Sequence, residues 1–202
     1  MLASFILSRC PALAKPFVRR LRDDTHGTAA VEFGLVGFLC ILLIVETMQA
    51  GFYFYTSGAL EFATAKAMRQ VLTGNVATGG LTATQFRTTI LCPLLPAAMP
   101  CSNVITNLRS VSQDPSSQGF YAFVTADQSA IIPPTMDNTQ TNFCAGTTGT
   151  VIYAQVYYAM PVFSPAWRMI GATMFNGALA HFVGAASVFR NEPFQAGQAA
   201  AC

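Results

Sequence analysis

The chain has 202 residues, of which 52% are hydrophobic and only 10% are charged. A soluble globular domain usually carries about 25% charged residues, so this composition argues against an ordinary soluble protein and favours a chain with a membrane-embedded part. The net charge is only +2, and the basic residues from Arg87 onward are balanced by acidic ones, so the sequence offers no basic patch of the kind that binds nucleic acid.

Residues 1–27 carry most of the positive charge of the N-terminal half. They contain five basic and two acidic residues, and a short apolar run precedes these charges. A secretory signal has the reverse order, with its charges before its apolar core. Arg9 also stands where a lipoprotein signal would need a small residue before Cys10. We therefore interpret residues 1–27 as a cytoplasmic leader.

Residues 33–55 form an apolar stretch in which Glu46 is the only charged residue. At ~1.5 Å per helical residue, these 23 residues are long enough to cross the ~30 Å hydrocarbon core of a bilayer. The alternative, a buried core helix of a soluble protein, is disfavoured by the length. The basic cluster on the N-terminal side predicts a single pass with the N-terminus inside the cell and the C-terminal part outside.

One long helix is expected from Thr28 to about Leu72, because no proline interrupts this range. Its length would be about 70 Å. Gly74 would take the C-cap role, so residues 28–74 form the long-helix segment. Because an amphipathic helix must bury its apolar stripe, we expect the rest of the chain to pack on the second half of this helix. That stripe recurs at helical spacing and consists of Leu60, Ala63, Ala67 and Val71.

Residues 75–202 are predicted to form one α+β domain with a mostly antiparallel sheet. The evidence is a set of segments rich in β-branched and aromatic residues and bounded by turn formers. They predict strands at residues 103–111, 119–127 and 150–160 and a closing strand at residues 178–189.

The helical signals of this domain are short. Thr82 and Gln85 form a capping box before one short helix, and Ser164 is the expected N-cap of another. Residues 74–80 are interpreted as a linker. Three prolines at positions 93–100 are expected to exclude regular structure there.

The cysteines are distributed as the predicted topology requires. Cys10 lies in the leader and Cys40 in the span, so neither is expected to form a structural bridge. Four cysteines fall on the side that we expect to be oxidising, namely Cys92, Cys101, Cys144 and Cys202. The short proline-rich loop favours a Cys92–Cys101 bridge, worth roughly 2.5–3 kcal/mol in the loop-entropy model. Cys144 would then pair with Cys202, which could instead remain free or bridge to another chain.

A carboxylate at membrane depth costs roughly 2.5–3.5 kcal/mol, so Glu32 is expected to have a partner. It could reach the headgroups at the cytoplasmic end of the helix. Alternatively, a cut after Gly27 would make Thr28 the first residue and Glu32 the fifth. The new ammonium could then reach the carboxylate of a staggered neighbour, a contact worth on the order of 4 kcal/mol at 4 Å and an effective dielectric of ~20, before desolvation costs.

The string "GTAAVEF", in which Gly27 precedes Glu32 and Phe33, resembles the type IV prepilin cleavage motif. The wider string that runs on to "AKAMRQVLTG" resembles the TadE family, the pseudopilins of the tight-adherence (Flp) pilus system. The later strings "VYYAMPVF" and "ASVFRNEPF" resemble the closing strand and tail of that family. The resemblance covers residues 22–74 and, more loosely, 149–194, whereas residues 75–148 carry no recognisable part of the family's sequence.

The resemblance implies that a membrane prepilin peptidase cuts between Gly27 and Thr28 at the cytoplasmic face of a bacterial inner membrane. The mature subunit would stay anchored with its domain in the periplasm, or enter the extracellular pilus. Its partners would be membrane lipid, other pilin or pseudopilin subunits and the assembly platform. Glu32 and Phe33 would serve recognition and assembly. Glu46 would pair with a neighbouring subunit or platform component, or else face a polar crevice near the outer interface.

Motifs of catalysis are missing from the sequence. It contains no zinc, nucleophile-elbow or phosphate-loop pattern. Of the two histidines, His26 would be lost with the leader and His181 lies in an apolar strand, where we expect an ordinary packed residue. We therefore expect a pseudopilin or minor pilin with no enzyme activity, no cofactor and no metal. The alternative is an uncleaved, single-pass, membrane-anchored periplasmic binding or sensing protein.

Overall fold

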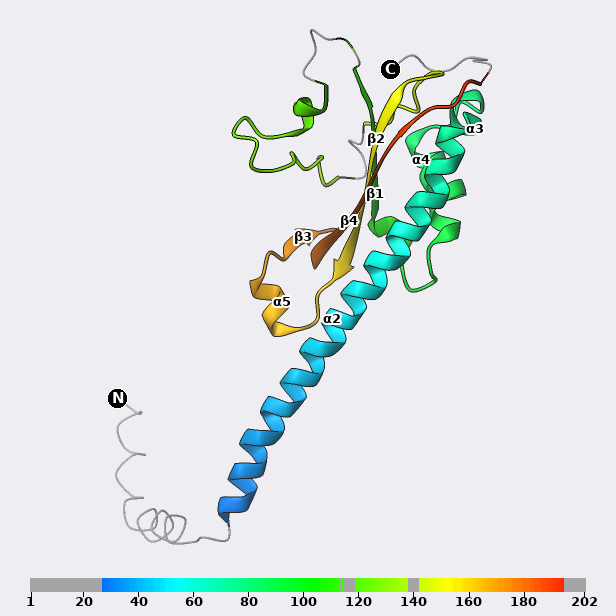
Figure 1. Ribbon diagram of the computed structural model, residues 1–202. Helices are drawn as coiled ribbons and strands as arrows, with labels where there is room; N and C mark the ends of the chain where they lie inside the picture. The colour runs from blue at the N-terminus through cyan, green and yellow to red at the C-terminus, as the bar shows by residue number, and fades with distance from the viewer. Residues whose placement is uncertain (1–26, 113, 115–118, 138–141, 195–202) are drawn as a thin grey trace, which may run out of the picture. The chain divides into compact units, whose positions relative to one another are not determined.

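A computed structural model describes residues 27–112, 114, 119–137 and 142–194 (Figure 1). The fold is α+β, with a long apolar N-terminal helix and an antiparallel sheet. The chain forms two compact units, residues 1–45 and residues 46–202. The first contains the beginning of the long helix, and the second contains the rest of that helix and every other described element.

The long helix, α2, runs from Thr28 to Leu72 and has the predicted extent. At its end the Thr73 N–H donates to the Arg69 carbonyl at 3.0 Å, and Gly74 donates to the Val71 carbonyl at 3.0 Å. Gly74 has φ +80°, and a Cβ there would collide with the Phe194 ring. Glycine is therefore needed at this turn. The predicted linker after it is wrong in part, because Asn75–Thr78 forms a short helix, α3.

Residues 28–45 of α2 pack little of their surface. Helix α2 is long and apolar enough to cross a membrane by length and composition, and none of its most apolar stretch is buried in the described molecule. The side chain of Phe33 is 80% exposed, and many other large hydrophobic side chains here are exposed as well: Val31, Leu35, Val36, Phe38, Leu39, Ile41, Leu43 and Ile44.

The sheet has four antiparallel strands in the order β1-β2-β4-β3. The strands are β1 (Val104–Val111), β2 (Val151–Pro161), β3 (Thr173–Phe175) and β4 (Ala178–Arg190). Three of the four predicted strands are thus confirmed, and β3 is an addition. The central pair is the longest, with Val151 opposite Arg190 and Pro161 opposite Ala180.

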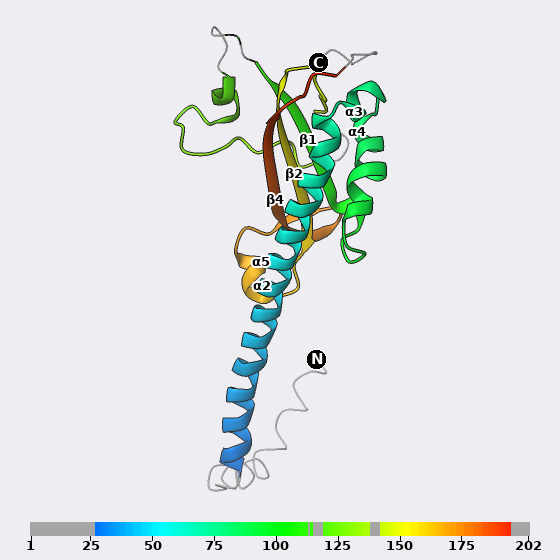
Figure 2. The ribbon, with the colours of Figure 1, turned by 45° about the vertical axis from the view of Figure 1, so that its right-hand side comes forward.

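The cyan half of α2 lies across one face of this sheet (Figures 1 and 2). The predicted stripe is buried there, since Leu60, Ala63, Ala67 and Val71 are all fully buried. From the sheet, this face contributes alternate residues of β1 and β2, which include Leu108, Ile152, Val156 and Tyr158. The prediction that the domain packs on the second half of the helix is confirmed.

Between α3 and the sheet the chain forms a run of short helical turns. The predicted capping box is present: Gln85 N–H donates to Thr82 Oγ1 at 3.3 Å, and Thr82 N–H donates to Gln85 Oε1 at 2.9 Å. It opens α4 (Ala83–Gln85), which continues as a π-helical segment, η2 (Phe86–Leu91). The 3-10 turns η3 (Cys92–Leu94) and η4 (Cys101–Asn103) follow. The expectation of no regular structure is therefore wrong at Pro93, because a proline in the first turn of a helix gives up no hydrogen bond.

The strand predicted at residues 119–127 is wrong. Gly119–Phe123 forms a 3-10 helix, η5, and the only pairing in this stretch is an isolated bridge between Val124 and Ile131. None of the nine residues is buried, so no sheet face selects an extended conformation here. The Phe123 ring instead packs edge-on against Tyr153, at 5.0 Å between ring centroids.

Candidate functional site

The residues of the proposed cleavage motif lie at the start of α2. Gly27 precedes the helix, Thr28 is its first residue, and Glu32 and Phe33 follow one turn later, all exposed. The backbone of Gly27 is not in the left-handed region, and a Cβ there would meet nothing within 4 Å. Nothing in the described part of the chain therefore requires glycine at position 27.

The Glu32 carboxylate has no hydrogen bond or ion pair within the part of the chain that the structure describes. It stands on an exposed helical segment among apolar side chains. The described part of the chain therefore does not satisfy this carboxylate, and any partner must come from outside these residues.

Glu46 differs from Glu32 because both of its carboxylate oxygens have partners in its own chain. Oε2 accepts a hydrogen bond from the Ser164 hydroxyl at 2.7 Å, and Oε1 accepts one from the Ala166 N–H at 3.0 Å. Ser164 in turn accepts from the Trp167 N–H at 3.3 Å, as the predicted N-cap of the short helix α5 (Pro165–Met169). Glu46 thus binds the first turn of α5, an arrangement that favours the polar-crevice interpretation of this acid.

Gln49, one turn after Glu46, makes the second polar contact with the same region. Its side chain is fully buried. Oε1 accepts from the Phe163 N–H at 3.1 Å, and Nε2 donates to the Pro161 carbonyl at 3.4 Å. Gln49 was not among the predicted residues, although it continues the helical face of Glu46 at a spacing of three.

Aromatic rings continue this face. Tyr53 of α2 packs against Trp167 of α5 and His181 of β4, with ring centroids 5.3 and 6.1 Å apart, and Trp167 lies 5.5 Å from His181. His181 is half-buried and packed among rings, as expected for it. One side of α2 from residue 46 to residue 71 therefore contacts the domain, and this includes the last part of the predicted span, residues 46–55.

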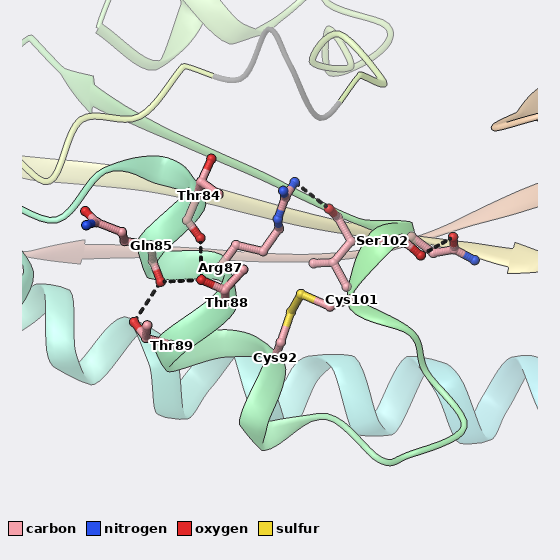
Figure 3. The surroundings of a disulfide bond; sticks show 10 residues. Thr84, Gln85, Arg87, Thr88, Thr89, Cys92, Cys101 and Ser102 are labelled. Carbon is pink, nitrogen blue, oxygen red and sulfur yellow. Dashed lines mark hydrogen bonds between the residues drawn. A yellow bond between two sulfur atoms is a disulfide. The ribbon is translucent and has the colours of Figure 1, made fainter.

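The Cys92–Cys101 disulfide is present, which confirms the favoured pairing (Figure 3). It joins the start of η3 to the start of η4, with 5.6 Å between the Cα atoms. Cys144 is disulfide-bonded too, while Cys202, the partner expected for it, lies outside the described residues. Cys40 is a free thiol and is exposed.

The face of the sheet that points away from α2 carries a buried polar network. The Asn107 amide donates to Gln155 Oε1 at 2.9 Å, and the Gln155 amide donates to the hydroxyls of Tyr153 and Tyr157 at 3.0 and 3.4 Å. Burial, and secondarily the nearby Tyr153 hydroxyl, raises the pKa of Tyr157. Burial also raises the pKa of Tyr158, against the effect of a hydrogen bond with Asn103. Tyr153 and Tyr157 therefore pack on this face of the sheet, whereas Tyr158 packs on the face toward α2.

Asp127 is the acid with the most shifted titration among the described residues. It lies in an exposed turn, where the Ser129 hydroxyl donates to Oδ2 at 2.6 Å. Hydrogen bonds from Ser129, and then from Thr125, lower the pKa of Asp127 to about 2. This carboxylate stabilises its own turn, because it is ionised at neutral pH and acts as an acceptor.

One cavity of about 310 Å³ lies between the α3–α4 region and residues 143–146. Its lining includes Val76, Leu81 and Phe143 and contains no charged side chain. Within the described ranges, no group of three His, Cys, Asp or Glu residues is arranged to hold a metal ion.

Comparison with known proteins identifies no relative of this chain. No protein-family model matches it, and no curated protein or solved structure is significantly similar to it. The candidate functional region is therefore defined by the residues themselves: a motif at the start of an exposed apolar helix, and a polar attachment to the domain beginning at Glu46.

Proposed function

We propose that the first unit anchors the chain in a membrane and that residues 28–45 are its span. These 18 residues reach about 27 Å as a helix, close to the ~30 Å of a hydrocarbon core. Their large hydrophobic side chains are exposed, as lipid-facing side chains would be. The span is shorter and begins earlier than residues 33–55, because from Glu46 onward the helix contacts the domain.

The basic residues before the span favour a cytoplasmic N-terminus, with the domain in the periplasm of a bacterial cell. The disulfide between Cys92 and Cys101 is consistent with that compartment, since structural disulfides form and persist in oxidising surroundings. The chain would thus be a single-pass protein of the inner membrane.

In this setting we infer a TadE-like pseudopilin or minor pilin of a tight-adherence pilus, matured by a prepilin peptidase. The observation that carries this inference is the contrast at the N-terminus of α2: Gly27, which the fold does not require, is followed by Glu32, which the described chain does not satisfy. A protease that needs glycine at the cut and a neighbour that needs an acid one turn later account for both.

The mechanism would be mechanical. Cleavage after Gly27 turns the Thr28 nitrogen into an ammonium group at the start of the helix. An ammonium of one subunit and Glu32 of a staggered neighbour attract strongly where little water screens them, and this attraction would set the register between packed helices. The subunits could then be stored in the membrane and added to a filament, or act as an assembly factor at its base.

The cleavage step is tested by intact-mass measurement of the chain from cells with and without a prepilin peptidase. We expect loss of residues 1–27 only when the peptidase is present, and no loss in Gly27→Ala. Gly37→Ala is the matched control, because a Cβ at either glycine would meet nothing within 4 Å. A leader retained in every strain would favour the alternative, an uncleaved membrane-anchored binding or sensing protein.

The docking step is tested by Glu32→Ala, which should abolish most pilus assembly while membrane insertion continues. Glu61→Ala is the control, since Glu61 is an exposed acid on the second half of the same helix. Piliation and membrane fractionation are the two measurements. Normal piliation by Glu32→Ala would remove the docking role from this residue.

A further inference from the structure

A second part of the chain exposes large apolar side chains, far from the apolar helix in sequence. From Phe163, just before α5, to Met174 in β3, the exposed fractions are 49% for Phe163, 88% for Met169, 65% for Ile170 and 66% for Met174. We call residues 163–174 the apolar loop. Its only charged residue is Arg168, and it contains no acid.

The apolar loop is fixed to one short part of α2. Glu46 accepts hydrogen bonds from Ser164 and Ala166, and Gln49 accepts one from the Phe163 N–H. The ring of Trp167 packs on Tyr53. All of these attachment points lie within residues 46–53, and Glu46 directly follows the last residue of the first unit.

This attachment determines a depth if residues 28–45 are the membrane span, so the inference rests on that part of the proposed function. A span of about 27 Å is slightly shorter than the ~30 Å hydrocarbon core, which places its last residue at the outer boundary of that core. Glu46 and Gln49 then lie in the headgroup layer, which is roughly 5–7 Å thick on each side. The groups that donate hydrogen bonds to them lie at the same level.

We propose that the apolar loop inserts into the outer headgroup layer of the membrane as a second lipid contact beside the helix. Its composition suits this layer. Tryptophan prefers the interface because its ring is apolar and its N–H is polar, and an arginine can extend its guanidinium to the lipid phosphates. Met169, Ile170 and Met174 would enter the acyl boundary, as the apolar face of an interfacial helix does. The loop would hold the domain at a fixed height on the membrane.

The fluorescence of Trp167 reports on the position of the apolar loop, because Trp167 is the only tryptophan in the sequence. The full chain is reconstituted into vesicles of phosphatidylcholine and phosphatidylglycerol, with or without bromine on acyl carbons close to the headgroup. Flotation of the vesicles first shows whether the protein is anchored. We expect bromine to quench most of the Trp167 emission.

A matched control moves the reporter along α2. Trp167→Phe combined with Phe62→Trp places a tryptophan at an exposed position sixteen residues beyond Glu46, about 24 Å farther along the helix. Its emission should not be quenched. Most of the quenching of Trp167 should be lost in the triple variant that combines Met169→Ser, Ile170→Ser and Met174→Ser.

The outcomes separate the two proposals. Floating protein with unquenched Trp167 overturns the loop contact and leaves the anchor standing, whereas protein that does not float overturns both. Unquenched emission that shifts with the protein-to-lipid ratio would show that a second copy of the chain covers the loop, which also overturns the lipid contact. Equal quenching at positions 62 and 167 would do the same, because the contact would not be confined to the loop.

Discussion

The two halves of α2 both carry large hydrophobic side chains, but their surroundings are opposite. Residues 28–45 expose their large hydrophobic residues, with Phe33 at 80% and Leu35 at 64%, whereas residues 46–72 bury a continuous stripe that includes Leu60 at 0%. Apolar content alone therefore does not decide which half supports the domain. What decides it is whether the rest of the chain provides a surface to pack on, as the sheet does for the second half.

Two of the acids of the helix, Glu32 and Glu46, repeat this contrast. Glu46 is satisfied by a hydroxyl and a backbone N–H of its own chain, while Glu32 has no partner within the described residues. Glu46 therefore contributes to the structure of the domain. Glu32 makes no such contribution within the described residues, which is why we propose a docking role for it.

The largest effect on the free energy of unfolding is expected when the same substitution, leucine to alanine, is compared in the two halves of α2. Leu60→Ala should lower the free energy of unfolding of the domain by about 2–5 kcal/mol, because it removes a fully buried side chain and leaves a cavity. Leu35→Ala, the same change at an exposed position, should leave it unchanged. Urea unfolding in detergent, followed by Trp167 fluorescence, measures both. Equal losses would mean that the first half of α2 also packs on the domain.

Much of this fold was predictable from the sequence because its signals are local. The absence of proline and the spacing of Leu60 to Val71 predicted the helix and its buried stripe, and residues 150–160 predicted the central strand. The Cys92–Cys101 bridge was favoured because its two cysteines are only nine positions apart and three prolines stiffen the loop between them. Short-range geometry and periodicity suffice for such features.

The rest depended on contacts between distant parts of the chain. Ser164 is 118 positions from Glu46, so no periodicity could have paired them. Residues 119–127 have aromatic and β-branched side chains but no neighbouring strand to pair with over their length, and they form η5 and a turn instead. Strand propensity describes how well a side chain fits a half-buried sheet surface. The sequence of a segment does not show whether a neighbouring strand and a packing layer will provide that surface.

A smaller effect on domain stability is expected when Glu46 or Glu32 is replaced. Glu46→Ala should destabilise the domain by about 1–3 kcal/mol, because the buried Ser164 hydroxyl and the Ala166 N–H lose their acceptor. Glu46→Gln keeps one acceptor oxygen and should lose less. Glu32→Ala should not change domain unfolding at all. The same urea measurement applies, and a Glu46→Ala domain as stable as the wild type would show that α5 is held by its other contacts.

The smallest expected effect on the free energy of unfolding is a stabilisation rather than a loss. Gly58 lies on an exposed face inside the second half of α2, and a Cβ there would meet nothing within 4 Å. Gly58→Ala should therefore stabilise the domain by about 0.5–1 kcal/mol, since alanine loses less backbone entropy in a helix than glycine does.

Gly34→Ala is the partner experiment in the first half, where the space around the glycine is equally open. Domain unfolding should stay at the wild-type value, because residues 28–45 contribute no buried stripe. If helices pack through this half in a filament, as proposed, the added methyl group would stand where small residues allow close approach, and assembly should fall. Stabilisation of the domain by both alanines to the same extent would mean that the two halves unfold as one unit, and the distinction between them would have to be given up.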